Sequence, residues 1–248
     1  MATVLSGTSG ALYYKPAGTK DDQLAASAFP STGSDITVGS YLNFKVNDQV
    51  TLTYPSGATT TGAIAAGDYY VLTYTASTGV MTVSSTEGGS AETATAQPSG
   101  FGTEKASIAY KSFQSVANVR TWSFEVTREE IDTTSIGGTL GQVAPFRTFI
   151  SGFADGSGSA EVYFTDDDTT IASRLIEDVT QRKQAGATFK LYMDAILSSG
   201  TPNDTTSRSI ELEAVLTSAS YAVSPDDAQT VSINFRPTSA PTFDFSKS

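Results

Sequence analysis

The chain has 248 residues, of which 39% are hydrophobic and 17% are charged, and it contains neither cysteine nor histidine. The absence of these two residue types excludes thiolate nucleophiles, disulfides, imidazole bases and zinc sites of the cysteine/histidine kind. The formal net charge of -11 disfavours binding to nucleic acid by attraction, because an acidic surface repels phosphate groups.

Length and composition also constrain the fold. The length fits one large β domain, or a smaller domain with an insertion, and is sufficient to bury a sizeable core. Glycine, serine, threonine and alanine are abundant, which is typical of many short strands joined by turns. No apolar run is long enough to span a bilayer, and the N-terminus lacks the features of a signal peptide. We therefore expect a mainly β chain that stays in a cytoplasm and does not itself bind a membrane.

The N-terminal part contains one predicted strand and then a block of different composition. Residues 10–16 (GALYYKP) predict a strand that ends at its proline. Residues 19–103 are rich in serine, threonine, glycine and alanine, and Lys45 is the only basic residue between positions 21 and 104.

Within this block the sequence predicts a small all-β module. Gly79 lies in a predicted turn and is expected to adopt a positive φ. Residues 85–102 have the composition of a flexible exit linker. Alternating apolar residues, among them Tyr70 and Leu72, predict strands at residues 42–46, 50–54, 70–74 and 80–83.

The remainder of the chain has a more regular strand pattern. In one strand Trp122, Phe124 and Val126 share a face, which is therefore assigned to the core. The predicted strands of this part are 106–112, 118–127, 146–153, 159–165, 188–196, 209–219 and 229–236.

One helix is predicted at residues 168–184. Ile171, Leu175 and Val179 recur at helical spacing, which indicates a single apolar face. Gly186 follows as a C-terminal stop signal. The expected order is therefore strands, one helix and further strands.

Two glycine-rich or acidic motifs could bind ions, and each has a structural explanation that we favour. Asp166, Asp167 and Asp168 could hold a hard cation, but adjacent acids also cap the N-terminus of a helix. Residues 155–159 (DGSGS) resemble a phosphate loop only superficially, because no lysine follows, and a turn between two strands is preferred.

Two further features could belong to a carbohydrate site. Glu129 and Glu130 could be the acid and base of a glycosidase, but neighbouring strand residues point to opposite faces, so a surface ion-pair cluster with Arg128 is favoured. Trp122 could stack on a sugar, but its phase with Phe124 favours core packing. No catalytic residue, metal site or cofactor is predicted.

Three stretches of the sequence form a distinctive composite. They are GALYY near the N-terminus, VRTWSFEVTREEIDTTSIGG at residues 119–138 and FRTFISGFADGSGSAEVYF at residues 146–164. Together they resemble the major tail tube proteins of long-tailed bacteriophages. The resemblance covers residues 8–18 and about 105–240.

The resemblance implies a two-sheet β-sandwich or partly open barrel, flanked by one α-helix, in a structural virion protein that is not an enzyme. It implies that six copies form a ring and that rings stack into a tail tube, a negatively charged conduit for genome ejection into the host. Expected partners are further copies of the chain, the tape measure protein in the lumen, the tail terminator and the baseplate or tail-tip proteins. Double-stranded DNA would pass non-specifically, and assembly would take place in the bacterial host cytoplasm.

Strand periodicity nominates acids that could line the lumen, because they alternate with predicted core residues. These candidates are Glu125, Glu161, Glu211 and Glu213. The loop at about residues 130–145 is the expected ring-stacking element, since it is extended and carries apolar side chains. Its stacking candidates are Glu130, Ile131, Ile136, Leu140 and Val143.

The block after the first strand departs from the family pattern. The tail tube domain is therefore predicted at residues 1–18 and 105–248, with an inserted β module at residues 19–104. A module of this size could hardly occupy a lumen that passes duplex DNA, so it is expected on the tube exterior. Exterior display favours a noncontractile tail that has no sheath.

Two alternatives from other classes remain open. The chain could be a β-rich adhesion or receptor-binding module of a virion or cell surface, with residues 19–103 as the binding head. A carbohydrate-active β-sandwich enzyme is the third possibility, and it requires two carboxylates that converge in a cleft.

Overall fold

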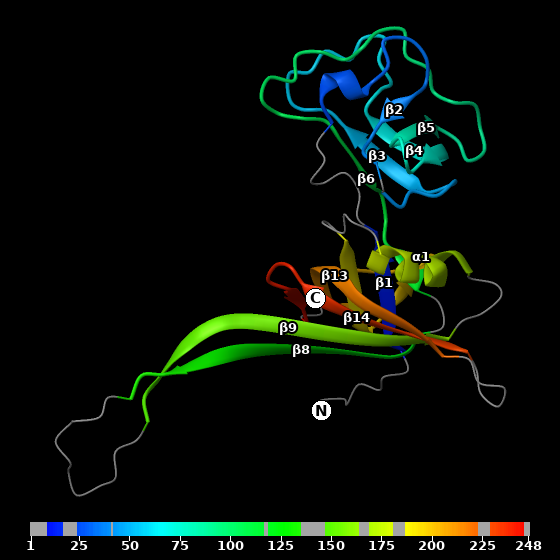
Figure 1. Cartoon of the computed structure of the whole chain (residues 1–248). Helices are drawn as coiled ribbons and strands as arrows, with labels where there is room; N and C mark the ends of the chain where they lie inside the picture. Colours follow the sequence, from blue (N-terminus) through cyan, green and yellow to red (C-terminus); the bar gives the residue numbers. More distant parts are fainter. Residues whose placement is uncertain are drawn as a thin grey trace, which may run out of the picture.

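A computed structural model describes residues 9–16, 24–40, 42–116, 119–134, 147–163, 169–180, 187–222 and 229–245. Antiparallel strands dominate these residues, and they contain one α-helix. The strands form an eight-stranded sheet, a five-stranded sheet and a two-stranded hairpin, β11 (Leu197–Ser198) with β12 (Thr201–Pro202). The predicted mainly β class with a single flanking helix is confirmed (Figure 1).

The eight-stranded sheet curls into a partly open barrel. Its strand order is β7-β1-β10-β13-β14-β9-β8, with β15 paired to β13. The two strands at the ends of this order, β7 and β8, are separated in the chain only by residues 117–118, so the sheet must curve to bring its ends together. Its strands are β1 (Ala11–Lys15), β7 (Gln114–Val116), β8 (Val119–Asp132), β9 (Phe149–Tyr163), β10 (Thr188–Asp194), β13 (Arg208–Ala222), β14 (Thr230–Pro237) and β15 (Thr242–Asp244).

One face of this sheet carries the first hydrophobic core. Helix α1 (Thr169–Thr180) covers this face, and its Leu175 is fully buried. Phe189 of β10 stacks on Phe235 of β14, with ring centroids 4.5 Å apart. The helix predicted at residues 168–184 is confirmed over the span of α1, and its two ends lie outside the described residues.

The predicted turn at DGSGS is wrong, because residues 155–159 lie in the middle of β9. The predicted strands at 146–153 and 159–165 are therefore parts of one strand. Gly156 and Gly158 face the core, and a Cβ at Gly158 would lie 2.2 Å from the ring of Phe235. These glycines serve close packing within a strand, since a side chain there would displace the aromatic core.

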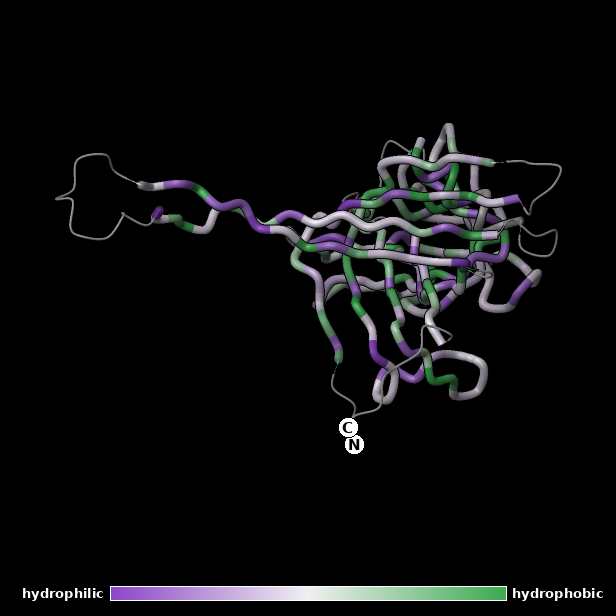
Figure 2. The backbone as a smooth tube through the Cα atoms, turned by 90° about the horizontal axis from the view of Figure 1, so that it is seen from below, coloured by the Kyte–Doolittle hydropathy of each residue, from purple (hydrophilic) through white to green (hydrophobic). Residues whose placement is uncertain are grey.

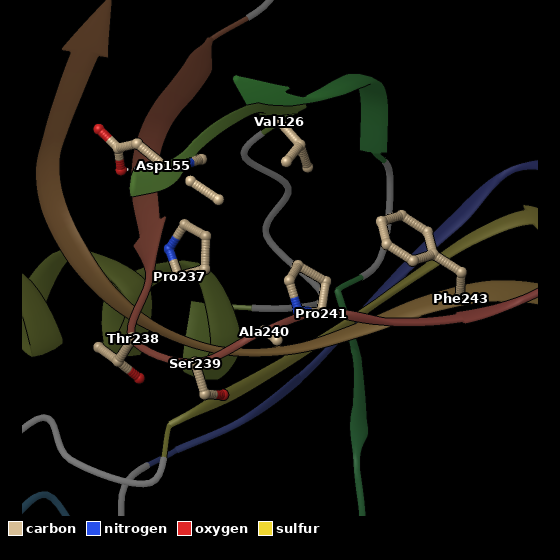
Figure 3. A pocket seen from close by; sticks show the side chains of 10 residues that line it. Val126, Asp155, Pro237, Thr238, Ser239, Ala240, Pro241 and Phe243 are labelled. Carbon is tan, nitrogen blue, oxygen red and sulfur yellow. Dashed lines mark hydrogen bonds between the residues drawn. The ribbon is translucent and has the colours of Figure 1, made fainter. Parts of the chain in front are cut away.

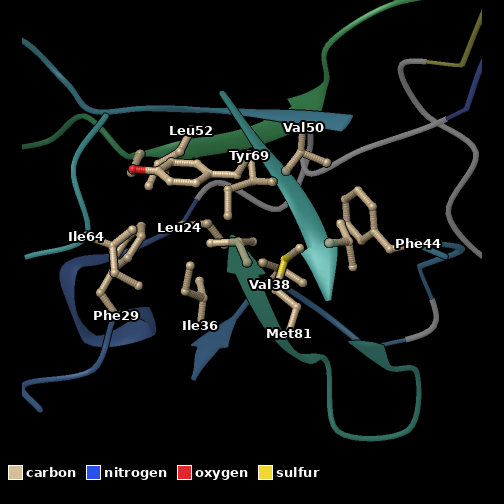
Figure 4. Packing of buried hydrophobic residues seen from close by; sticks show 14 of the residues in the cluster. Leu24, Phe29, Ile36, Val38, Phe44, Val50, Leu52, Ile64, Tyr69 and Met81 are labelled. Carbon is tan, nitrogen blue, oxygen red and sulfur yellow. The ribbon is translucent and has the colours of Figure 1, made fainter. Parts of the chain in front are cut away.

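The second sheet is built from residues 24–110, which we call the five-stranded unit. Its strand order is β2-β5-β4-β3-β6, and it encloses a separate hydrophobic core (Figure 4). The sheet extends past residue 104, the predicted module boundary, because β6 pairs with β3. Its elements are the 3-10 helix η2 (Ala26–Ala28), β2 (Ile36–Thr37), β3 (Gln49–Thr53), β4 (Gly67–Thr75), β5 (Val80–Ser84) and β6 (Ser107–Tyr110).

Two local predictions in this unit are wrong in their details. Residues 42–46 are not a strand; the segment is irregular and ends in a turn where Asn47 has a φ of 70°. In β4 the buried side chains are Tyr69 and Val71, not Tyr70 and Leu72. A register shift against β5 after Val71 interrupts the alternation that periodicity assumes.

The segment at residues 85–102 packs against the unit and does not have the structure of a free linker. Ala94 is buried and pairs with Gly33, while Ser99 pairs with Thr59. The positive φ expected at Gly79 is confirmed at 70°. A Cβ at Gly79 would lie 2.4 Å from the backbone carbon of Gly39, so the position also requires glycine for space.

Gly158→Ala should destabilise the barrel, because the new methyl group collides with the ring of Phe235. Overpacking of this kind costs about 1–3 kcal/mol of unfolding free energy. Ser157→Ala is the matched control, since Ser157 is the exposed neighbour on the other face of β9. Equal free energies of unfolding for the two variants in denaturant titrations would contradict the packing role of Gly158.

Candidate assembly interface

Strands β8 and β9 extend far beyond the sheet as a two-stranded arm (Figures 1 and 2). Strand β14 pairs with β9 only at residues 158–163, whereas β8 pairs with β9 as far as Asp132 opposite Phe149. The arm therefore consists of residues 125–132 and 149–157. An isolated two-stranded ribbon is marginally stable in water. A ribbon of this length therefore indicates a surface that is stabilised by contact with another chain.

The arm exposes large apolar side chains near its end. Ile131 lies opposite Ile150, and both are exposed. Phe153 is 85% exposed, in a bulge where it and Gly152 lie opposite Glu129. Exposed apolar groups gathered on one element mark an interaction surface more reliably than isolated ones.

The charged residues of the arm do not form the predicted ion-pair cluster. The Nε of Arg128 donates to the backbone oxygen of Gly152 at 3.4 Å, and no ion pair joins it to Glu129 or Glu130 in the described part of the chain. Glu129 and Glu130 are consecutive residues of β8, so their carboxylates do not converge on one bond. Hydrogen bonds from the side chain and backbone of Thr134 lower the pKa of Asp132.

Two of the five predicted stacking residues belong to the described part of the chain. Glu130 and Ile131 both lie on the exposed arm. Ile136, Leu140 and Val143 lie outside the described residues. The sequence predicts this strand only as far as residue 127, yet β8 continues to Asp132.

The four acids nominated for the lumen share one face of the curled sheet. Glu161 lies between buried Ala160 and Val162, so its side chain points away from the core. The same alternation places the others on this face, which we call the polar face. The four are Glu125 of β8, Glu161 of β9, and Glu211 and Glu213 of β13.

The polar face is a surface of paired charges and hydroxyl groups. Ser123 and Ser159 hydrogen-bond across β8 and β9 at 2.8 Å. Cations accompany several acids through the ion pairs Arg120–Glu161 at 3.2 Å, Lys190–Glu211 at 3.5 Å and Arg236–Asp155 at 2.5 Å. Several carboxylates of this face are therefore paired with cations.

Lys190 also anchors the hairpin beside this face. Its Nζ lies 2.8 Å from Asp204 Oδ1, which also accepts a hydrogen bond from the Tyr192 hydroxyl. Partial burial acts to raise the pKa of Asp204, but the hydrogen bonds from Lys190 and Tyr192 outweigh it and lower the pKa.

The strands that carry the polar face have two open edges among the described residues. Strand β8 pairs with β9 on one side, and no described strand pairs with its other side. Strand β10 pairs with β13 only over residues 208–213, so residues 217–220 of β13 have a described strand partner only in β14. Open edges present backbone groups that can pair with another chain.

A hollow lies where the arm leaves the barrel. It has a volume of about 500 Å³ and is lined mainly by apolar groups (Figure 3). Val126 and Gly156 contribute from the arm, and Pro237, Pro241 and Phe243 from the C-terminal segment. The lining has one charged residue, Asp155, which is paired with Arg236, so the hollow offers packing area and no catalytic group.

The described residues contain no group of three or more acids that could hold a metal ion, and Asp166, Asp167 and Asp168 lie outside them. No described helix is both long and apolar enough to cross a membrane.

Solved structures with a similar arrangement come from viral and virus-like particles. The virion of a native gene transfer agent particle is 21% identical, with a TM-score of 0.38 over 53% of this chain and 88% of that chain. The tail of an empty gene transfer agent particle with C6 symmetry is 21% identical, with a TM-score of 0.38 over 53% and 86%. The SPP1 tail tube is 16% identical, with a TM-score of 0.39 over 55% and 70%.

No protein-family model matches the chain, and no curated protein sequence matches it. The structural neighbours are parts of particles and tails, the class that the sequence resembles.

Phe153→Ser should leave the isolated subunit intact, because the ring of Phe153 is almost fully exposed. We expect a change of less than about 0.5 kcal/mol in unfolding free energy by denaturant titration. Phe235→Ser is the comparison, since a buried Phe lost from a core costs about 3–5 kcal/mol. A large loss in Phe153→Ser would mean that the arm tip packs within its own chain.

Proposed function

We propose that the chain is the tube-forming subunit of a phage-like tail. Copies join side by side into hexameric rings, the rings stack, and the resulting lumen conducts double-stranded DNA during ejection into a host. One observation carries the proposal. The four strands β13-β14-β9-β8 have an open edge at each end and a polar face opposite their core.

The strand directions permit a closed ring. All three pairings within this group are antiparallel, so β8 and β13 run in opposite directions. The β8 edge of one copy can therefore pair antiparallel with residues 217–220 of the next copy, and every subunit adds the same four strands. Closure pairs the edges that each separate subunit exposes.

The polar face would then line the lumen. Helix α1 and the first core lie on its other side, so ring closure with the polar face inward leaves the apolar core undisturbed. Glu125 makes no ion pair in the described part of the chain, while cations accompany Glu161 and Glu211. A lumen of hydroxyl groups and excess acid would let DNA slide, because its cations are paired with acids and are not free to hold phosphates.

The arm would make the contact between rings. It projects from the barrel (Figure 2) and exposes Ile131, Ile150 and Phe153. Burial of these apolar side chains against another copy would be favourable, because it removes apolar surface from water. Glu130 lies on the same ribbon and would flank this contact.

The five-stranded unit would sit on the tube exterior as an inserted module. The order of layers supports this placement: the polar face, the curled sheet, α1, and then the five-stranded unit (Figure 1). Such a layer outside the helix leaves little room for a sheath, which favours a noncontractile tail. The lumen would hold the tape measure protein before ejection, and terminator and tip proteins would close the two ends.

Cysteine cross-linking tests the ring interface directly, because the chain has no cysteine of its own. Ser123→Cys on β8 is combined with Ser218→Cys, or separately with Ser220→Cys, on β13. Within one chain these strands are three strand spacings apart, about 14 Å, which is too far for a disulfide. Oxidised assemblies should give a ladder of covalent oligomers that ends at the hexamer.

The single-cysteine variants are the controls and should give no ladder. Electron microscopy of the same samples checks for hollow tubes of constant diameter. Monomers or trimers at high concentration would contradict a tube and favour the adhesion module. Tubes without any cross-link would retain the tail role but overturn the proposed pairing of β8 with β13.

A further inference from the structure

Helix α1 separates two hydrophobic cores that share no residue. Leu175, Ile176 and Val179 of the helix pack into the barrel core. Arg174, Glu177 and Asp178 contact the five-stranded unit, and their spacing of three and four residues puts them on one face of the helix. The contact between the two cores at α1 is therefore polar.

Arg174 is the central residue of this contact. Its side chain is fully buried, and Nη2 donates to Asp48 Oδ1 at 2.9 Å and to Oδ2 at 3.0 Å. Nη1 lies 3.4 Å from Oε1 of Gln114 on β7, and the guanidinium lies over the ring of Tyr110 at 5.6 Å. One side chain thus joins the helix, the barrel edge and the five-stranded unit.

Asp178 provides the second connection, one helical turn further along. Its Oδ1 accepts a hydrogen bond from the amide of Asn43 at 2.7 Å, and its Oδ2 accepts one from the hydroxyl of Tyr14 on β1. Burial raises the pKa of Asp178, and burial together with the neighbouring carboxylate raises the pKa of Tyr14, so the phenol remains a donor.

The segment at residues 42–48 is shaped to meet the helix. Asp48 Oδ2 accepts from the backbone amide of Lys45 at 2.7 Å, and the hydroxyl of Tyr110 donates to the backbone oxygen of Asn43 at 2.9 Å. These bonds hold Asn43 and Asp48 toward α1, which explains why the segment is not the predicted strand. Lys45 adds a half-exposed ion pair to Glu177 at 2.6 Å.

A buried polar network of this kind acts on geometry more than on net stability. Removing two charges from water offsets most of the attraction between them, so such a pair adds little stability over apolar residues of similar volume. Removing one partner alone leaves a buried charge without compensation and is strongly unfavourable. A network of directional bonds therefore favours one arrangement of the two units over neighbouring ones.

We infer that Arg174, Asp48, Asp178, Asn43 and Tyr14 form an orientation clamp that holds the five-stranded unit at one fixed angle to the barrel. The clamp is a property of the single subunit and does not depend on the proposed tube. In that tube, it would make every exterior unit project in the same direction, as a rigid part of the wall.

Distances between two spin labels test the clamp. The labels are attached at Glu87→Cys in the five-stranded unit and Ser198→Cys on β11, both exposed positions away from the proposed ring edges, and the labelled chain is diluted with unlabelled chain so that only distances within one copy are measured. Double electron–electron resonance on the otherwise unchanged chain should give one narrow distance peak. The double variant Arg174→Met with Asp48→Leu removes the central ion pair without leaving a charge unpaired, and its single narrow peak should be lost.

Circular dichroism and thermal unfolding of the labelled double variant show whether both cores stay folded. Lys45→Met is the matched control, because it removes only the half-exposed pair with Glu177, and its peak should stay narrow. Asn43→Ala is the second test variant, since it deletes one buried donor while the Arg174 pair remains, and it should broaden the peak. A narrow peak at the original distance in a folded double variant, or in Asn43→Ala if the double variant does not fold, would overturn the clamp.

Discussion

Backbone hydrogen bonding at the strand edges is the constraint on which the rest of this structure depends. A strand edge presents backbone amides and carbonyls that need hydrogen-bond partners. A long flat edge is a template for pairing with another strand. Here the sheet curls until β7 and β8 approach, but β8 remains at the end of the strand order and its arm runs beyond the body. The subunit is thus a folded unit whose edges suit assembly with further copies.

Strand alternation divides the barrel into two chemically different faces. The core face gathers Phe189, Phe235 and Leu175, and it accepts Gly158 because only a hydrogen atom fits beside the ring of Phe235. The polar face carries the nominated acids together with cations and serine hydroxyls. Each strand therefore contributes to stability on one side and to the proposed lumen on the other.

Helix α1 has two contact faces where an isolated surface helix would have one. Its apolar side completes the barrel core, and its charged side receives the five-stranded unit. From the sequence alone, Arg174 and Asp178 have the pattern of a solvated helix face, and no local signal distinguishes the two cases. Their partners Asp48 and Asn43 lie more than a hundred residues away in the chain, so only the fold reveals that these charges are buried.

The sequence by itself determined the β class, the single helix and the position of Glu125, Glu161, Glu211 and Glu213 on the face opposite the core, because these follow from local periodicity and composition. Tertiary structure decided the strand boundaries at places where the alternation is interrupted, or where a glycine is needed for close packing and not for a turn. It merged two predicted strands into β9, since the space beside Gly158 is filled by Phe235 from β14, and it extended β8 beyond residue 127 to Asp132. The local sequence pattern indicates which residues are apolar and belong to a core. Contacts between distant segments of the chain decide which residues each of them packs against.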